Sequence, residues 1–147
     1  MRRKRAWDWE PTATIPADAQ TGVYSWEGQA AQYPPTGVPG ISYFAGEVPN
    51  GKPVNCLLYR DEHGELVGIL NHYDDTYWSG GILPYILEVP GNVNMWVKPS
   101  ERRKGIGTAL LEEAERRYGP LELHQQRYTE AGAAFVKALL LKRRTNG

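Results

Sequence analysis

A basic turn with two glycines carries the clearest chemical signal in this sequence. Three consecutive cations at residues 102–104 are followed by Gly105 and Gly107. An apolar segment at residues 93–97 precedes the turn, and an amphipathic segment follows it. The first N–H groups of a helix lack acceptors inside the helix, and the helix dipole favours negative charge at that end. The combination predicts a site that holds a phosphate group.

Two common phosphate-binding motifs do not fit this spacing. A P-loop needs a Lys-Ser or Lys-Thr pair after its second glycine, where this chain continues with Thr108 and Ala109. The dinucleotide fingerprint needs a third glycine, where this chain has Leu110. What is left is an Arg-x-x-Gly-x-Gly pattern at residues 102–107, between an expected strand and an expected helix.

This strand–turn–helix pattern resembles the pyrophosphate-binding motif of GNAT-type N-acetyltransferases, which bind acetyl-coenzyme A. The resemblance implies that main-chain amides cradle the pyrophosphate and that a strand edge binds the pantetheine arm as an added strand would. The implied cradle comprises Arg102, Arg103, Lys104, Gly105, Ile106, Gly107 and Thr108. The implied strand edge comprises Met95, Trp96 and Val97. The alternative is a basic surface turn before an ordinary helix.

The resemblance also implies a direct acetyl transfer, in which a primary amine of a small molecule or a protein attacks the thioester. This chemistry needs a group that titrates near neutrality and donors that face the carbonyl oxygen. Glu88, which precedes the motif strand, His124 and Glu122 are the candidate bases, in that order. Imidazole titrates near neutrality without perturbation. A solvated glutamate and a hydrogen-bonded structural histidine are the respective alternatives.

The sequence gives a weaker signal for the acid that protonates the leaving thiolate than for the base. The last helix of the family often carries a Phe-Tyr pair whose tyrosine serves as the acid, but this chain has Phe135 and Val136 at that place. Tyr128 is the candidate substitute, and a structural tyrosine at a helix start is the alternative. The missing acid leaves a non-catalytic acyl-CoA-binding module as the alternative function.

Acetyl-CoA is the only cofactor that the sequence predicts. His72, Asp74 and Asp75 are close in sequence but have no distant partner, which makes them a weak ligand set, and no metal is expected.

Hydrophobic patterning outlines the elements that would position these residues. It predicts strands at residues 54–60, 66–73, 82–89, 93–97 and 121–125 and helices at residues 106–118 and 129–141. The last helix is expected to bury Ala131, Ala134, Phe135, Ala138 and Leu139. The strands at residues 93–97 and 121–125 would splay apart and form the gap for the reacting groups.

The predicted fold is α/β (α+β), a GNAT-like mixed, mainly antiparallel sheet with a splayed central strand pair flanked by helices. Residues 1–147 would form a single domain, with an irregular or helical substrate-side region at 6–48 and a cofactor-binding core at 50–141. Family members usually continue into two further strands after the last helix. The sheet is therefore expected to be smaller, or to be completed by the N-terminal region or by another subunit in a homodimer.

The charge balance and residue composition of the chain restrict the classes of partner that it could bind. With 17 basic and 17 acidic residues, the chain as a whole is not an electrostatic nucleic-acid binder. The basic clusters at residues 2–5 and 142–144 are interpreted as solvated ends, with binding to nucleic acid or membrane phosphates as the alternative. No apolar run is long enough for a membrane span, and a lone cysteine excludes an internal disulfide. A cytoplasmic location is expected, with aromatic residues of segments 7–43 and 73–78 lining the acceptor site.

Overall fold

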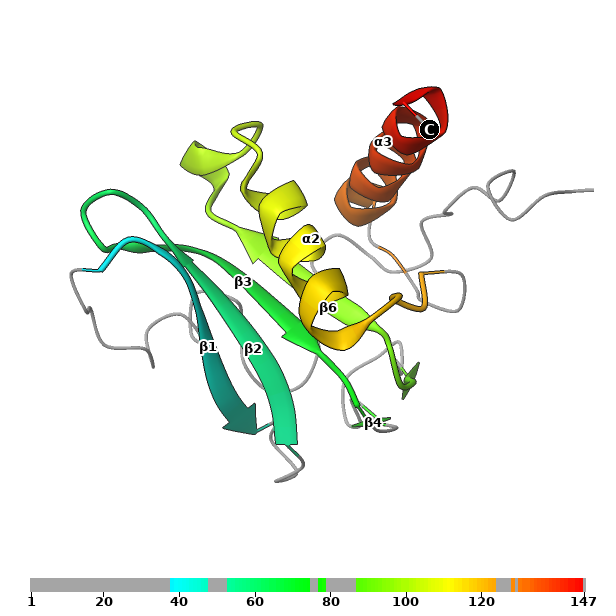
Figure 1. Ribbon diagram of the computed structural model, residues 1–147, viewed down its shortest axis with the longest axis horizontal. Helices are drawn as coiled ribbons and strands as arrows, with labels where there is room; N and C mark the ends of the chain where they lie inside the picture. Colours follow the sequence, from blue (N-terminus) through cyan, green and yellow to red (C-terminus); the bar gives the residue numbers. More distant parts are fainter. Residues whose placement is uncertain are drawn as a thin grey trace, which may run out of the picture.

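The computed structural model describes residues 38–47, 53–74, 77–78, 87–123, 128 and 130–146 of the chain. The strands are β1 (Gly40–Glu47), β2 (Pro53–Arg60), β3 (Leu66–His72), β4 (Tyr77–Trp78), β5 (Leu87–Glu88) and β6 (Val93–Val97). The helices are the short 3-10 helix η2 (Pro99–Glu101) and the α-helices α2 (Ile106–Tyr118) and α3 (Glu130–Asn146). Figure 1 shows β1, β2, β3 and β6 as one twisted sheet with α2 lying across it.

The main sheet has the strand order β1-β2-β3-β6, and all of its neighbouring strands are antiparallel. β4 and β5 form a separate antiparallel pair. In the turn between β2 and β3, the Asp61 carboxylate accepts the main-chain N–H groups of His63 (2.9 Å) and Glu65 (3.0 Å). Gly64 has a φ of 82° in this turn, a conformation that glycine adopts without steric penalty. The predicted hairpin is confirmed.

The two faces of the sheet carry separate apolar clusters, because successive side chains of a strand point to opposite faces. The first cluster lies beneath α2, and its strand residues include Leu57, Leu70 and Val93. Burial of each large aliphatic side chain stabilises the fold by about 1.5–3 kcal/mol. The second cluster lies on the opposite face and contains the buried residues Val54, Cys56, Leu58, Ile69 and Tyr73.

Helix α2 lies close to the sheet because Gly68 of β3 places no side chain beneath it. A Cβ atom at residue 68 would lie 2.9 Å from Ile106 Cγ2 and 3.1 Å from Leu110 Cδ1. Ile106, Leu110, Leu111 and Ala114 are the buried residues of the helix. The same packing that seats α2 on the sheet therefore fixes the position of its N-terminal end, which follows the basic turn.

The edge strand β1 corrects the prediction of an irregular or helical region at residues 6–48. Its sequence, Gly-Ile-Ser-Tyr-Phe-Ala-Gly-Glu, includes β-branched and aromatic residues, and Ile41 packs against the first apolar cluster. The many glycines and prolines around this segment obscured that pattern. Residues 6–37 of that predicted region lie outside the described residues.

The strand predicted at residues 121–125 is wrong for residues 121–123, which form no ladder in the described structure. Residues 124 and 125 lie outside the description. Glu122 N–H donates a hydrogen bond to Gly91 O (2.9 Å), so the segment meets the start of β6 without running along it. Of the strand predicted at residues 82–89, the described part forms β5.

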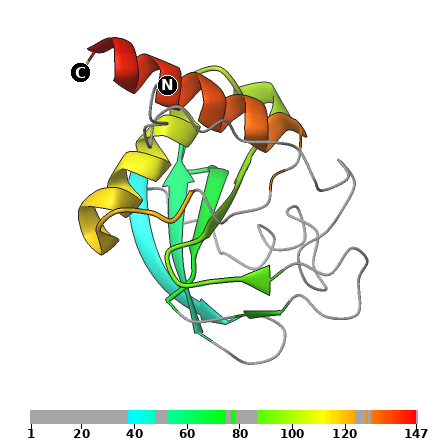
Figure 2. The ribbon, with the colours of Figure 1, turned by 90° about the vertical axis from the view of Figure 1, so that its right-hand side faces the viewer.

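Helix α3 is longer than predicted, and its buried stripe agrees with the prediction only in part. Leu139 is buried as predicted and Phe135 is half-buried, whereas Ala131, Ala134 and Ala138 are exposed. Ala133 and Val136 are buried in their place, and burying a valine removes more apolar surface from water than burying an alanine does. Figure 2 shows α3 running past the N-terminal end of α2. None of the helices among the described residues has the length and apolar character needed to cross a membrane.

Candidate functional site

The turn between β6 and α2 is shaped by two residues in the left-handed conformation. Lys98 N–H donates to Val67 O (2.8 Å), which extends the β3–β6 pairing to the start of the turn. After η2, Arg103 has a φ of 66° and Gly105 has a φ of 84°. Turns that contain left-handed residues bring successive main-chain N–H groups toward one point and thereby form anion-binding concavities.

The N-terminal end of α2 leaves main-chain donors open. The helical hydrogen bonds begin with Ala109 N–H, which donates to Gly105 O (3.0 Å), and no side chain caps the helix at Gly105. Within the part of the chain that the structure describes, the main-chain N–H groups of residues 103–108 have no acceptor. No acidic residue lies in the first turn of the helix. This end of α2 therefore offers several donors and a favourable dipole to an anion.

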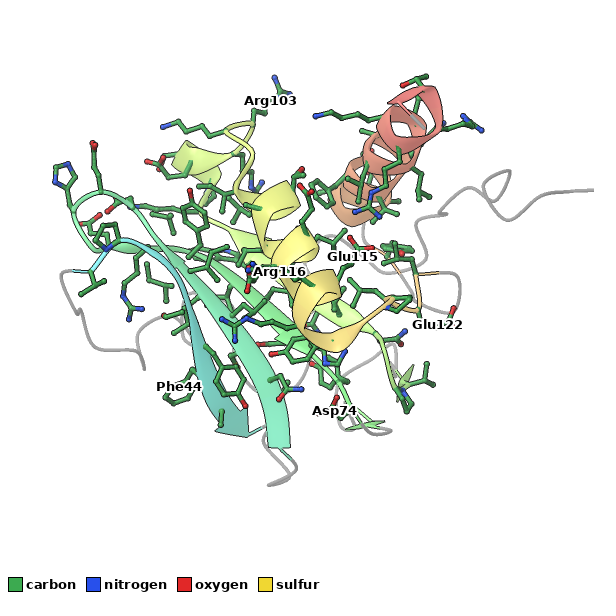
Figure 3. The ribbon with its side chains drawn as sticks, in the orientation of Figure 1. Phe44, Asp74, Arg103, Glu115, Arg116 and Glu122 are labelled. Carbon is green, nitrogen blue, oxygen red and sulfur yellow. The ribbon has the colours of Figure 1, made fainter. Side chains whose placement is uncertain are left out.

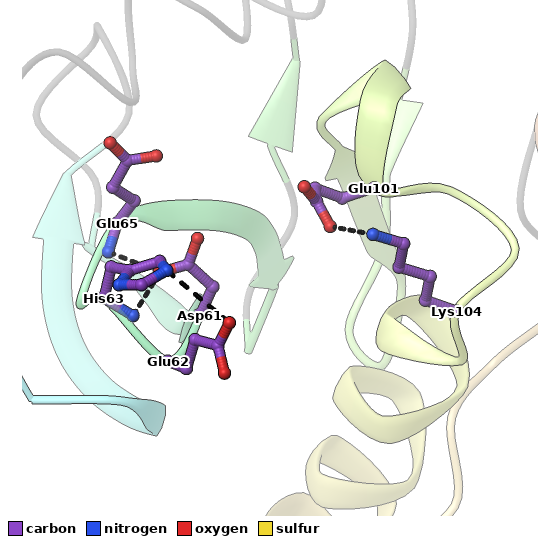
Figure 4. Close-up of polar contacts among 6 residues, drawn as sticks. All are labelled: Asp61, Glu62, His63, Glu65, Glu101 and Lys104. Carbon is purple, nitrogen blue, oxygen red and sulfur yellow. Dashed lines mark hydrogen bonds and ion pairs between the residues drawn. The ribbon is translucent and has the colours of Figure 1, made fainter.

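The cations of the turn have different roles. Lys104 Nζ pairs with Glu101 Oε2 at 2.8 Å, and this hydrogen bond raises the pKa of the lysine (Figure 4). Arg102 Nε donates to Val97 O (3.1 Å) and so ties the turn to the end of β6. Arg103 is exposed and extends away from the turn (Figure 3). Arg103 is thus the cation best placed to reach a ligand from outside.

The free edge of β6 lies beside this turn. Tyr73 N–H donates to Asn92 O (3.0 Å), and Lys98 N–H donates to Val67 O. Because hydrogen-bonded and non-bonded residues alternate along an antiparallel pair, the main-chain groups of Trp96 face β3. Those of Met95 and Val97 face the free edge, with which no described strand pairs. The edge predicted for the pantetheine arm therefore consists of Met95 and Val97, and Trp96 does not contribute main-chain groups to it.

Gly107 is constrained by packing, which adds to the sequence argument that a glycine opens the backbone to phosphate. A Cβ atom at this position would lie 3.0 Å from Met95 Cε and 3.0 Å from Phe135 Cε2. The glycine thus lets β6, α2 and α3 meet at one point. By contrast, a Cβ at Gly105 would meet nothing within 4 Å, so the requirement there comes from the positive φ.

A junction at Gly91 and Asn92 joins the start of β6 to residues 121–123. Asn92 is fully buried, its Nδ2 donates to Glu122 O (3.0 Å), and its Oδ1 accepts Val89 N–H (3.0 Å). A Cβ at Gly91 would lie 3.1 Å from Glu122 Cβ. The two segments are therefore held together at this point and form no ladder beyond it. Sequence reasoning missed Asn92, although Pro-Gly-Asn before a strand marks a specialised turn.

Of the three predicted catalytic residues, the described structure places Glu88 and Tyr128 in different segments. Glu88 belongs to β5, where its Cα pairs with that of Tyr77. His124 lies outside the described residues. Tyr128 is buried, its hydroxyl donates to Leu123 O (2.8 Å), and burial raises its pKa. This geometry favours the structural role that the sequence left open for Tyr128.

A polar cluster at the opposite end of α2 was also missed. The buried His72 ring stacks on Tyr118 with 4.2 Å between the ring centroids. Asn55 Nδ2 contacts His72 Nδ1 (3.2 Å) and donates to Asp74 Oδ2 (2.7 Å). Burial lowers the pKa of His72, and the Asp74 carboxylate opposes part of this shift. Among the described residues, no group of three His, Cys, Asp or Glu side chains is placed to hold a metal ion.

In this α/β protein, a free strand edge leads through a basic turn into a helix without a side-chain cap, an arrangement that favours an anion. A comparison with known families makes this specific. The family model of the acetyltransferase (GNAT) domain matches residues 52–139, more than half of the 147 residues. The chain belongs to the GNAT acetyltransferase family, as the motif at residues 102–107 predicted. Comparisons with curated proteins and with solved structures found no match.

Proposed function

We propose that this protein is an N-acetyltransferase that transfers an acetyl group from acetyl-CoA to a primary amine of a small molecule or a protein. The observation that carries the proposal is the set of open main-chain donors at residues 103–108, placed beside the free edge of β6 in a chain of the GNAT family. The residues that the resemblance assigns to the cofactor lie in β6, in this turn and at the start of α2. An anion fits there because the donors point toward it and the turn carries positive charge.

The cofactor would bind in three parts. The N–H groups of residues 103–108 would hold the diphosphate, and Arg103 would add an ion pair at its outer side. The pantetheine amides would pair with the outward main-chain groups of Met95 and with Val97 N–H, because Val97 O already accepts Arg102 Nε. The thioester would then lie along β6, between the basic turn and the junction at Gly91 and Asn92.

The reaction would be a direct transfer within a ternary complex. The amine nitrogen attacks the thioester carbon, a C–N bond forms, the C–S bond breaks, and the amine proton ends on the thiolate sulfur. We propose Glu88 and His124 as the candidate bases. Tyr128 would have to leave the Leu123 carbonyl before it could donate its proton to the sulfur.

A non-catalytic acyl-CoA-binding module is the second candidate, and the last helix provides the observation that favours it. Where the family often carries its acidic tyrosine, this chain has Val136, which is only 4% exposed. The neighbouring Phe135 lies against Gly107. Helix α3 thus supplies packing at the position where relatives place a proton donor. Acetyl-CoA binding without thiol release across a broad panel of amines would favour the module.

Titration of the full chain with acetyl-CoA tests the proposed binding. We expect saturable binding in the micromolar range, and no binding at millimolar ligand would refute the cofactor assignment. Arg103→Gln should weaken binding about three- to tenfold at low salt and less at high salt, because salt screens an exposed charge. Arg116→Gln is the matched control, since this exposed arginine pairs with Glu113 farther along α2 and away from its N-terminal end. Thiol release in the presence of amines then separates the enzyme from the module.

We further propose one domain over residues 1–147, a cytoplasmic location and an acceptor site that includes aromatic residues of segments 7–43 and 73–78. A homodimer that completes the sheet is part of the same proposal. Analytical ultracentrifugation of the full chain at micromolar concentration tests the homodimer, and a monomer at all concentrations would refute it.

A further inference from the structure

Asn94, at the centre of β6, has a carboxamide that is hydrogen-bonded on one side. Its Nδ2 group donates to the Tyr73 hydroxyl at 2.8 Å. Within the described part of the chain, its Oδ1 atom is buried and has no hydrogen-bond partner. The large majority of buried side-chain polar atoms in native structures have such a partner, so an unpaired acceptor beside a candidate site indicates an absent donor.

The position of Asn94 separates it from the cofactor cradle. Met95 points to Gly107 of α2, so its neighbours Asn94 and Trp96 lie on the opposite face of the sheet. Trp96 accordingly packs against the second apolar cluster. A cofactor bound along the edge of β6, with its diphosphate on the α2 side, would leave the face that carries Asn94 to a second reactant.

The distance along the strand matches the reach of the cofactor arm. Asn94 lies three residues before Val97, or about 10 Å at a rise of about 3.3 Å per residue. The arm between the diphosphate and the sulfur contains two amide groups and compares with an extended peptide of about three to four residues, about 10–13 Å. A diphosphate held beyond Val97 therefore places the thioester near Asn94.

We propose that Asn94 binds the acceptor amine, with its Oδ1 atom accepting one N–H group of the amine beside the thioester. This inference rests on the acetyltransferase function proposed above and assigns a residue to its acceptor site. Tyr73 is a positioning residue. Its hydroxyl accepts a hydrogen bond from Asn94 Nδ2, and this orients the carboxamide so that Oδ1 faces the amine. The Tyr73 side chain is itself held in the second apolar cluster.

The contact selects primary amines. A neutral primary amine has two N–H groups and one lone pair, so one N–H can donate to Asn94 while the lone pair attacks the thioester carbon. The C–N bond forms, the C–S bond breaks, and the other amine proton is transferred to the sulfur. The product amide keeps the N–H that faces Asn94. A secondary amine would give a product amide without any N–H and would lose this contact.

Steady-state kinetics of the full chain, with hydroxylamine as the acceptor probe and thiol release corrected for the uncatalysed rate, test the assignment. Asn94→Ala should lower kcat/KM for hydroxylamine about three- to tenfold, mainly through its KM, with the KM for acetyl-CoA unchanged. Asn94→Asp keeps an acceptor oxygen and should stay within about twofold of the wild type. Arg116→Gln, at an exposed arginine that pairs with Glu113 on α2, is the control and should leave the KM for hydroxylamine unchanged.

The outcomes separate this inference from the proposed function. An unchanged KM for hydroxylamine in Asn94→Ala, or an equal change in the KM for acetyl-CoA, overturns the inference. A lower activity of Asn94→Asp than of Asn94→Ala also overturns it, because the amide N–H would then be the required group. Acetyl-CoA binding by the wild type without thiol release from any amine refutes the Asn94 assignment and favours the binding module over the enzyme, while leaving the cofactor assignment intact. Absence of acetyl-CoA binding refutes the proposed function as well.

Discussion

The two ends of helix α2 differ in how their main-chain polar groups are satisfied. At the N-terminal end, the main-chain N–H groups of residues 103–108 have no acceptor within the described residues. At the C-terminal end, Gly119 N–H donates to Glu115 O (2.9 Å), and Arg116 and Arg117 complement the dipole. There, Tyr118 stacks on His72, whose ring also contacts Asn55.

This contrast supports the proposal that the N-terminal end of α2 binds the cofactor. That end also carries the left-handed residues, a free strand edge and a net charge of +3, from four cations and one carboxylate at residues 98–104. Open main-chain donors beside positive charge favour an anion.

Substitution of Gly107 should have the largest effect at the open end. In Gly107→Val, the added side chain meets Met95 and Phe135, and we expect a loss of about 1–3 kcal/mol in the free energy of unfolding together with a loss of acetyl-CoA binding. Denaturant unfolding and calorimetric titration measure the two effects. Wild-type affinity in a folded Gly107→Val protein would contradict the packing described here.

A pair of glycine substitutions compares the two ends directly. Gly105 and Gly119 both have a φ of 84° and open space around a Cβ, but Gly105 has a ψ of 6° and Gly119 a ψ of −170°. Gly105→Ala should destabilise the fold by about 1–2 kcal/mol. Gly119→Ala should cost at least as much, about 1–3 kcal/mol, because its conformation is almost confined to glycine. Only Gly105→Ala should also weaken acetyl-CoA binding, because only that residue shapes the donor cluster. Calorimetric titration measures the affinity of each variant for acetyl-CoA. Equal affinities would contradict the proposal that only the N-terminal end of α2 binds the cofactor.

Tyr128→Phe tests the structural role of the buried hydroxyl. Removal of its hydrogen bond to Leu123 O should lower the free energy of unfolding by about 1 kcal/mol. If Tyr128 acts only in structure, kcat for thiol release from acetyl-CoA should change little. A large fall in kcat with unchanged stability would instead identify Tyr128 as the acid.

The closed end should respond to pH through His72. Burial lowers the pKa of His72 in the folded chain, so the unfolded chain, with a pKa of about 6.5, binds a proton at higher pH. Stability should therefore fall as the pH drops below that value toward the folded pKa. Thermal unfolding between about pH 7.5 and about pH 5.5 measures this effect, and His72→Gln should reduce it. His63→Gln, in the exposed hairpin turn, is the control, and an equal change in both variants would contradict the assignment.

The elements around the basic turn could be predicted because their signals are local. β6 and α2 have the predicted bounds, and the hairpin of β2 and β3 follows from alternating apolar residues and a turn that contains Gly64. The predicted strand at residues 121–125 depended on a partner elsewhere in the chain, and residues 121–123 contact β6 only at its start in the described structure. Apolar residues alone do not reveal whether such a partner exists.

The sequence predicted the part of the candidate site that is formed by main-chain geometry. It did not predict the part that is formed by side-chain contacts between residues far apart in the sequence. The glycine spacing predicted the turn before α2, in which Gly105 is left-handed. The hydrogen bond of Asn92 to Glu122 and that of Asn94 to Tyr73 link residues 30 and 21 positions apart. No spacing rule within one segment predicts such pairs. The alternation that assigns Met95 and Val97 to the free edge likewise requires the register with β3.

Because the junction at Asn92 holds one end of β6, the length of this strand fixes the distance from the junction to the basic turn. One end of the strand is fixed by the Asn92 amide and the other by Arg102 on the Val97 carbonyl, so the number of residues between them sets the spacing of the two ends. An insertion of one residue would lengthen this spacing by about 3.3 Å and exchange the faces of every side chain beyond it. Substitutions in β6 can therefore be tolerated more readily than any change in its length.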